Sequence, residues 1–159
     1  MPVSARPPPF TVSDNMLSDT SVSFLKRLLD TPGPSGFEAA PAREWREEAA
    51  KFAKVESDVH GNSMATVVPD GRPTIMLAGH IDEIGVIATY IDDEGFVYIQ
   101  PIGGWDVQVL VGQRIRFIGS AGPVYGVVGK KPIHLLKTED REKASKIAEL
   151  WVDIGVNSR

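Results

Sequence analysis

Short strands separated by glycine-rich turns fill the sequence after residue 84, and this spacing constrains the fold most. β-Branched and aromatic residues concentrate in residues 86–91, 96–101, 113–118 and 124–129, and residues 150–154 alternate like one more strand. Turn residues separate these runs, at 92–95 (DDEG), 103–104 (GG) and 119–123 (GSAGP). A small β-barrel or sandwich is predicted for this part, with a short helix within residues 138–149.

Two amphipathic helices are predicted nearer the N-terminus. The first follows the N-cap oxygens of residues 18–21, and its apolar stripe is Phe24, Leu25, Leu28 and Leu29. Residues 32–36 (PGPSG) end it, because proline cannot donate a hydrogen bond within a helix. The second helix has Pro41 near its first turn and is expected to turn Trp45 inward.

Three short strands are predicted after the helices, at residues 54–57, 63–68 and 74–79. Residues 60–62 (HGN) and 70–73 (DGRP) are the turns between them. The expected fold class is therefore α/β: a helix-flanked sheet, followed by a small all-β, barrel-like part.

Composition excludes several classes of partner. A net charge of −4 offers no electrostatic attraction to nucleic acid or to an anionic membrane, and no stretch approaches the roughly 18 apolar residues of a membrane span. Without cysteine there is no disulfide, no thiolate zinc site and no thiol nucleophile, which favours a cytoplasmic protein. Residues 1–17 are expected to form a flexible tail, within which Met16 is a second candidate start.

One apolar run ends abruptly in ionisable groups, at residues 75–85 (IMLAGHIDEIG). Such runs suit a strand buried on both faces, and ligand sites gather beyond the carboxyl ends of such strands. Because residues two apart on an extended chain project to the same side, the carboxylate of Asp82 is expected close to the imidazole of His80. A carboxylate on the non-ligating nitrogen is what a metal-bound histidine usually has.

The motif has a plainer interpretation when taken alone. A bare His-x-Asp pair more often marks a hydrogen-bonded histidine at a strand edge beside a solvated turn. Glu83 fits a catalytic base and a surface acid equally well, since its sequence neighbours do not distinguish the two.

Residues 77–85 (LAGHIDEIG) resemble the signature of the glutamyl and tetrahedral (TET) aminopeptidases, a metallopeptidase family also labelled endoglucanase M. Further stretches agree with that family in order: 32–38 (PGPSGFE), 103–106 (GGWD), 111–114 (VGQR), 131–136 (KPIHLL) and 152–155 (VDIG). The resemblance runs from about residue 24 to the end. Several separated matches in the right order favour a metal ligand at His80.

The resemblance implies an α/β catalytic domain interrupted by a small β domain that mediates assembly. Residues 18–83 would then be the first part of the catalytic domain, and residues 84–159 an inserted β-barrel-like domain that is not complete. Family members bind two divalent ions, commonly zinc or cobalt, and hydrolyse peptides from the N-terminus. By this resemblance His80 is a metal ligand and Asp82 its catalytic partner, and the remaining ligands lie in a second half that follows this sequence.

One histidine cannot hold a pair of metal ions, since a catalytic zinc normally takes three protein ligands and water. The chain is therefore expected to be inactive alone and to bind metal weakly or not at all, as a truncated gene product, a frameshifted reading or a deliberately cut piece. A homo-oligomer, or a partner supplying the C-terminal half, is expected. The alternative is a non-catalytic oligomerisation module derived from the family. Glycoside hydrolysis needs two facing carboxylates, and no such pair stands out.

Overall fold

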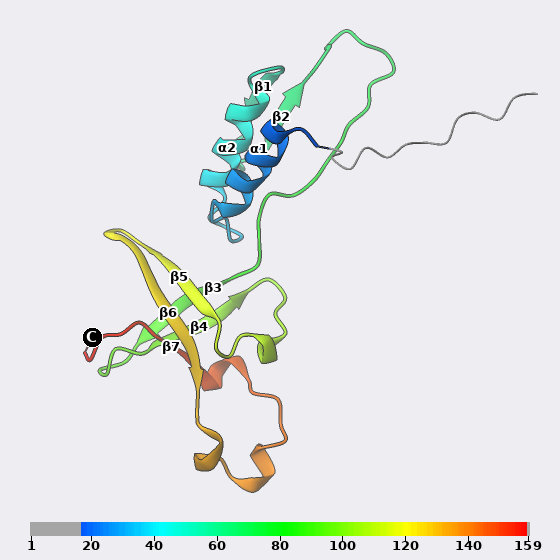
Figure 1. Cartoon of the computed structure of the whole chain (residues 1–159). Coiled ribbons are helices and arrows are strands. Elements are labelled where there is room, and N and C mark those ends of the chain that lie inside the picture. The colour runs from blue at the N-terminus through cyan, green and yellow to red at the C-terminus, as the bar shows by residue number, and fades with distance from the viewer. Residues whose placement is uncertain (1–16, 159) are drawn as a thin grey trace, which may run out of the picture. The chain divides into compact units, whose positions relative to one another are not determined.

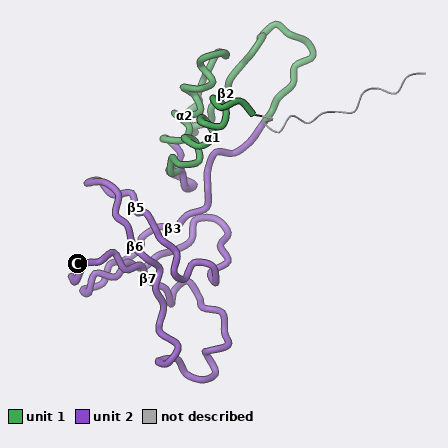
Figure 2. Tube along the Cα trace, viewed as in Figure 1, with its two compact units in different colours: residues 1–32, 39–77 green, residues 33–38, 78–159 purple. Residues whose placement is uncertain are grey.

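A computed structural model of the chain describes residues 17–158. The described chain divides into two units, which Figure 2 shows in different colours. The first unit holds the residues up to 32 together with 39–77, and the second holds residues 33–38 and those from 78 on. The predicted flexible tail lies outside the described residues except for Leu17.

The first unit consists of two helices and a β-hairpin (Figure 1): α1 (Asp19–Asp30), α2 (Ala39–Ala49), β1 (Lys54–Ser57) and β2 (Ser63–Thr66). Ser18 caps α1, since its side chain accepts a hydrogen bond from the backbone N–H of Ser21 at 3.2 Å. The guanidinium of Arg27 on α1 donates to Glu48 on α2 at 3.0 Å. Trp45 is half-buried. As predicted, α1 follows the N-cap residues and ends before residues 32–36, and α2 has Pro41 in its first turn.

The strand predicted at residues 74–79 is wrong. These residues pair with no strand in the described chain, and Ile75, Met76 and Leu77 are 78%, 86% and 94% exposed. Apolar composition indicates a preference for burial, but a central strand also needs neighbours that satisfy its N–H and C=O groups. The described residues supply none, so the predicted helix-flanked sheet is reduced here to the β1–β2 hairpin.

The second unit is built on a curled antiparallel sheet with the strand order β3-β4-β7-β6-β5. Its strands are β3 (Gly85–Ile91), β4 (Val97–Ile102), β5 (Arg114–Gly119), β6 (Gly122–Lys130) and β7 (Leu150–Asp153). The pairing of β3 with β4 shifts between Ala88 and Tyr90. Such a bulge bends a strand and increases its twist, which contributes to the curl.

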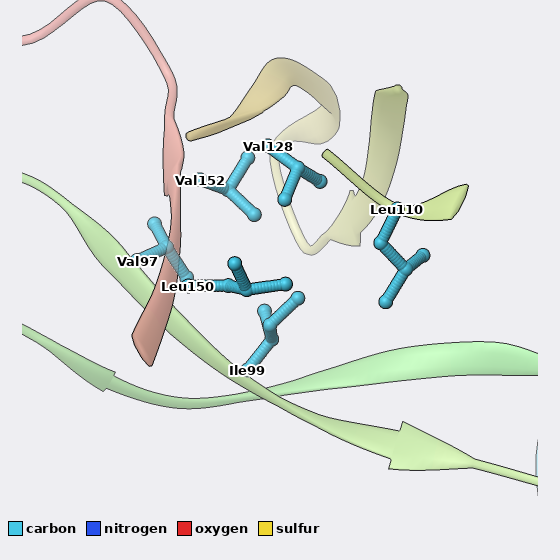
Figure 3. Packing of buried hydrophobic residues seen from close by; sticks show 6 residues of the cluster. All are labelled: Val97, Ile99, Leu110, Val128, Leu150 and Val152. Carbon is cyan, nitrogen blue, oxygen red and sulfur yellow. The ribbon is translucent and has the colours of Figure 1, made fainter. Parts of the chain in front are cut away.

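The core of the second unit lies on one face of this sheet (Figure 3). Its buried side chains alternate along β4 and β7, as a period of two requires. Val128 joins them from β6, and Leu110 from a turn that precedes β5. The members are Val97, Ile99, Leu110, Val128, Leu150 and Val152. Outside this cluster, the ring of Trp151 packs on Phe96 with 5.9 Å between the ring centres.

The predicted fold class is confirmed, since the chain combines helices with an antiparallel, curled sheet. The five strands predicted after residue 84 are all present, displaced by one or two residues at their ends. The predicted helix within residues 138–149 is reduced to two 3-10 turns, Thr138–Asp140 and Ile147–Glu149. None of the helices in the described part of the chain has the length and apolar character that a bilayer crossing requires.

Candidate metal-ligand site

His80 and Asp82 lie together in the second unit, in the segment that leads into β3. Nδ1 of His80 is 2.8 Å from Oδ1 of Asp82 and 3.0 Å from the Asp82 backbone oxygen. Both partners are acceptors, so Nδ1 carries the proton when the ring is neutral, and Nε2 keeps its lone pair. The side chain of His80 is 85% exposed, and Nε2 has no partner among the described residues. A carboxylate on Nδ1 is also the partner that a metal-bound histidine usually has.

The contact between the two side chains agrees with the sequence analysis, but the surrounding structure does not. His80 was expected at the carboxyl end of a central strand, whereas the residues before it form no strand. The roles of His80 as a metal ligand and of Asp82 as its catalytic partner stay predictions.

Asp82 is held in its charged form. Ser35 donates its hydroxyl to Oδ2, and the imidazole of His80 donates to Oδ1. These two hydrogen bonds, that of Ser35 first, keep the pKa of the Asp82 carboxyl below its usual value of 3.8. The carboxylate therefore stays an acceptor at neutral pH.

Glu83 is exposed, as a surface acid would be, and it also makes two hydrogen bonds with Gly33. Its Oε1 accepts a hydrogen bond from the backbone N–H of Gly33 at 2.9 Å, and its own N–H donates to the Gly33 carbonyl at 2.9 Å. The side chain thus ties two segments together. The role of Glu83 as a catalytic base stays a prediction, since the second carboxylate oxygen accepts no hydrogen bond from the described residues.

The segment of residues 33–38 is the part of the site that sequence reasoning missed. It follows the end of α1, as predicted, but it also belongs to the second unit (Figure 2). Within that unit, Pro34 forms a parallel bridge with Glu83. The turn at 103–106 also contacts the site segment, since Nε1 of Trp105 donates to the Gly85 carbonyl at 2.7 Å. Both stretches are among those that resemble the aminopeptidase family. Their presence beside the His80 motif in that resemblance was the one sequence signal that could have linked them to the site.

The described residues do not complete a metal site. Among them, no three histidine, aspartate or glutamate side chains gather as a metal would require. The other two histidines, His60 and His134, lie in a turn and in the 3-10 turn Ile133–Leu135. The residues present fit one corner of a metal site and do not fit a whole one.

Solved structures of aminopeptidases share this fold. The described architecture matches a TET aminopeptidase from a marine sediment archaeon of the Thaumarchaeota, with a TM-score of 0.83, 35% identity, and coverage of 88% of this chain and 39% of that one. It also matches the TET1 peptidase of Pyrococcus horikoshii, described as assembling into a tetrahedron or a large octahedral shell, with a TM-score of 0.74, 32% identity, and coverage of 86% and 41%. The described fold is therefore that of the matching part of TET-type aminopeptidases.

The chain belongs to the M42 glutamyl aminopeptidase family, whose model matches residues 61–159. Among curated relatives, a lysyl aminopeptidase of Pyrococcus furiosus is 35% identical over 140 residues, which cover 86% of this chain and 40% of that protein. A glutamyl aminopeptidase of Lactococcus lactis is 32% identical, with coverage of 71% and 33%. The chain spans about two fifths or less of the length of these relatives.

Proposed function

We propose that this chain supplies part of a metal-dependent aminopeptidase, in which His80 is a metal ligand and Asp82 is the carboxylate that holds its imidazole. The observation that carries the proposal is the hydrogen bond from Nδ1 to Asp82, because it leaves the lone pair of Nε2 facing solvent. Membership of the M42 family supports a peptide substrate that is cleaved at its N-terminus.

The proposed cofactor is a pair of divalent ions, zinc or cobalt, as the resemblance implies. When bound, such ions polarise the peptide carbonyl and activate water. The described residues contribute one imidazole and its carboxylate partner to this site. The remaining ligands must come from outside them, so no catalytic step is assigned to this chain alone.

Metal binding at His80 is tested with Co²⁺, a paramagnetic ion that broadens NMR signals near its site. Titration of the ¹⁵N-labelled chain should first broaden the amide signals around His80. We expect His80→Ala to weaken Co²⁺ binding by roughly 10-fold or more, since losing even an indirect metal contact costs that much. His60→Ala is the matched control, because His60 lies in an exposed turn of the other unit. Equal weakening by both substitutions would contradict the proposal.

Turnover is the second test. We expect the chain alone not to hydrolyse aminoacyl p-nitroanilides in the presence of zinc or cobalt, because a two-metal site needs more ligands than His80 and Asp82 supply. Metal-dependent turnover that His80→Ala abolishes would contradict this expectation. It would mean that neighbouring copies of the chain share ligands.

The alternative function is a non-catalytic oligomerisation module. It is favoured by the second unit, which has its own buried core and holds most of the described chain. The TET1 relative, whose structure is described as forming a tetrahedron or a large shell, supports a homo-oligomer here. If assembly is independent of the metal, the oligomer seen by light scattering will survive chelation and His80→Ala. Loss of the oligomer both on chelation and in His80→Ala would count against the module and favour the aminopeptidase proposal.

A further inference from the structure

The segment of residues 33–38 contacts Asp82 and Glu83, which follow the candidate ligand His80. The Gly33 backbone exchanges two hydrogen bonds with Glu83, each 2.9 Å long, and Ser35 donates to the carboxylate of Asp82. Pro34 and Glu83 also form a parallel bridge. These contacts join two stretches that lie about fifty residues apart in the chain.

Close packing limits how far this segment can move. A Cβ atom added to Gly85 would lie 2.8 Å from Cβ of Pro34, closer than real side chains approach. The absence of a side chain at Gly85 therefore lets the backbone of residues 33–35 lie directly against the site segment. Ser35 is presented to Asp82 by backbone contacts on one side and by this packing on the other.

The two oxygens of Asp82 are divided between two donors. Oδ2 receives the hydroxyl of Ser35, and Oδ1 receives Nδ1 of His80. The carboxylate of an aspartate rotates over a broad, two-fold range when nothing holds it. Since the group is planar, holding Oδ2 also fixes the direction of Oδ1, and with it the position of the imidazole.

We propose that Ser35 is a positioning residue for His80. Through its hydrogen bond to Asp82, Ser35 keeps the proton on Nδ1 of His80 and leaves Nε2 directed outward as the metal-binding nitrogen. The metal-binding part rests on the proposed function, whereas the control of the imidazole by Ser35 does not. Ser35 donates to Asp82 and makes no hydrogen bond with the imidazole of His80.

The inference is tested by the tautomer of His80, which a merely structural serine would not change. Long-range ¹H–¹⁵N correlation spectra of the full chain at about pH 8, where imidazoles are neutral, distinguish the Nδ1–H form from the Nε2–H form. We expect the Nδ1–H form to predominate. In Ser35→Ala the ratio of Nδ1–H to Nε2–H should fall roughly fivefold, which corresponds to the loss of one typical hydrogen bond.

Two further variants make the test specific. Ser35→Thr keeps a hydroxyl and should restore the ratio, whereas Ser120→Ala removes an exposed hydroxyl from the turn between β5 and β6 and should leave the ratio unchanged. Backbone amide spectra of each variant show that the fold is kept. An unchanged ratio in folded Ser35→Ala would overturn the inference, and so would a change of equal size in Ser120→Ala.

Co²⁺ titration of the same variants separates this inference from the proposed function. Because one corner of a metal site binds weakly, the titration is carried to a large excess of Co²⁺. If the tautomer ratio responds to Ser35→Ala but Co²⁺ in this excess broadens the amides around His80 no more than those around His60, positioning by Ser35 holds and the metal proposal fails. If Co²⁺ binds at His80 while the ratio of Nδ1–H to Nε2–H is unchanged in Ser35→Ala, the metal proposal stands and positioning by Ser35 fails.

Discussion

Asp82 accepts two hydrogen bonds, and both favour its charged form. The pKa of its carboxyl lies below the usual 3.8, first because of the hydroxyl of Ser35 and second because of the imidazole of His80. Since the folded pKa is the lower one, the contribution of these bonds is complete above pH 3.8 and is lost as the pH falls through the folded pKa. We therefore expect the contact of Asp82 with His80 to persist on acidification until the pH is below 3.8. The carboxyl ¹³C shift of Asp82 reports its midpoint.

The matched variant for this titration is Ser35→Ala. Removing the donor with the largest effect should raise the midpoint of Asp82 toward 3.8, while the fold stays intact because Ser35 is exposed. A midpoint at or above 3.8 in the unaltered chain would contradict the hydrogen bonds described.

Sequence spacing predicted the pair at this site but not the residue that holds it. His80 and Asp82 are two positions apart, so a local argument brings their side chains together. Ser35 lies 47 positions from Asp82, and local patterns indicate only that its segment ends a helix. Contacts at that separation depend on the tertiary fold, which local periodicity in the sequence does not determine.

The antiparallel pairing of β6 with β7 depends on the missing side chain of Gly126. A Cβ atom there would lie 2.5 Å from Cγ1 of Val152 and 2.7 Å from the carbonyl oxygen of Asp153. We expect Gly126→Ala to destabilise the second unit by about 1–3 kcal/mol, the usual cost of overpacking a core. Hydrogen exchange of the β6 and β7 amides measures this loss.

Gly104→Ala provides the comparison for that substitution. No heavy atom lies within 4 Å of a Cβ added at Gly104, so its effect should stay within about 0.5 kcal/mol, as for most surface substitutions. Equal protection of β6 and β7 amides in both variants would show that the sheet relaxes around the added methyl group.

Strand predictions were correct where the alternating pattern within the strand decides the outcome. The prediction was wrong at residues 74–79, where a strand would need pairing partners from other parts of the chain. The alternation in β4 and β7 matches the buried positions Val97, Ile99, Leu150 and Val152. Residues 74–79 carry an equally strong apolar run, but no described strand pairs with them. An apolar run indicates that a segment tends to be buried, but the segments that bury it come from elsewhere in the fold.

At the scale of the whole molecule, that uncovered segment should drive association. Ile75, Met76 and Leu77 are 78%, 86% and 94% exposed, and contiguous apolar surface of this kind marks contact sites or aggregation. We expect oligomers of the purified chain, and we expect replacement of Ile75 and Leu77 by serine to reduce their mass. Multi-angle light scattering over a range of concentrations measures both.

Val59→Ser is the control for this prediction. Val59 is 96% exposed but stands outside the contiguous run, in the turn between β1 and β2, so its replacement should leave the mass distribution unchanged. A monodisperse monomer at every concentration would contradict the expected association, whatever the variants do.

The hydrogen bonds between Gly33 and Glu83 also determine when the site can form. As the chain is synthesised, Gly33 emerges about fifty residues before its partner, while α2 and the β1–β2 hairpin can form from neighbouring residues. Closing a loop of that length costs roughly 3 to 4 kcal/mol of chain entropy, which only the finished contacts offset. Contacts this distant form slowly. The hydrogen bond from Ser35 to Asp82 is exposed, and exposed hydrogen bonds open readily in the folded state. The geometry around His80 should therefore be among the last features to appear during folding and among the first to be lost on warming.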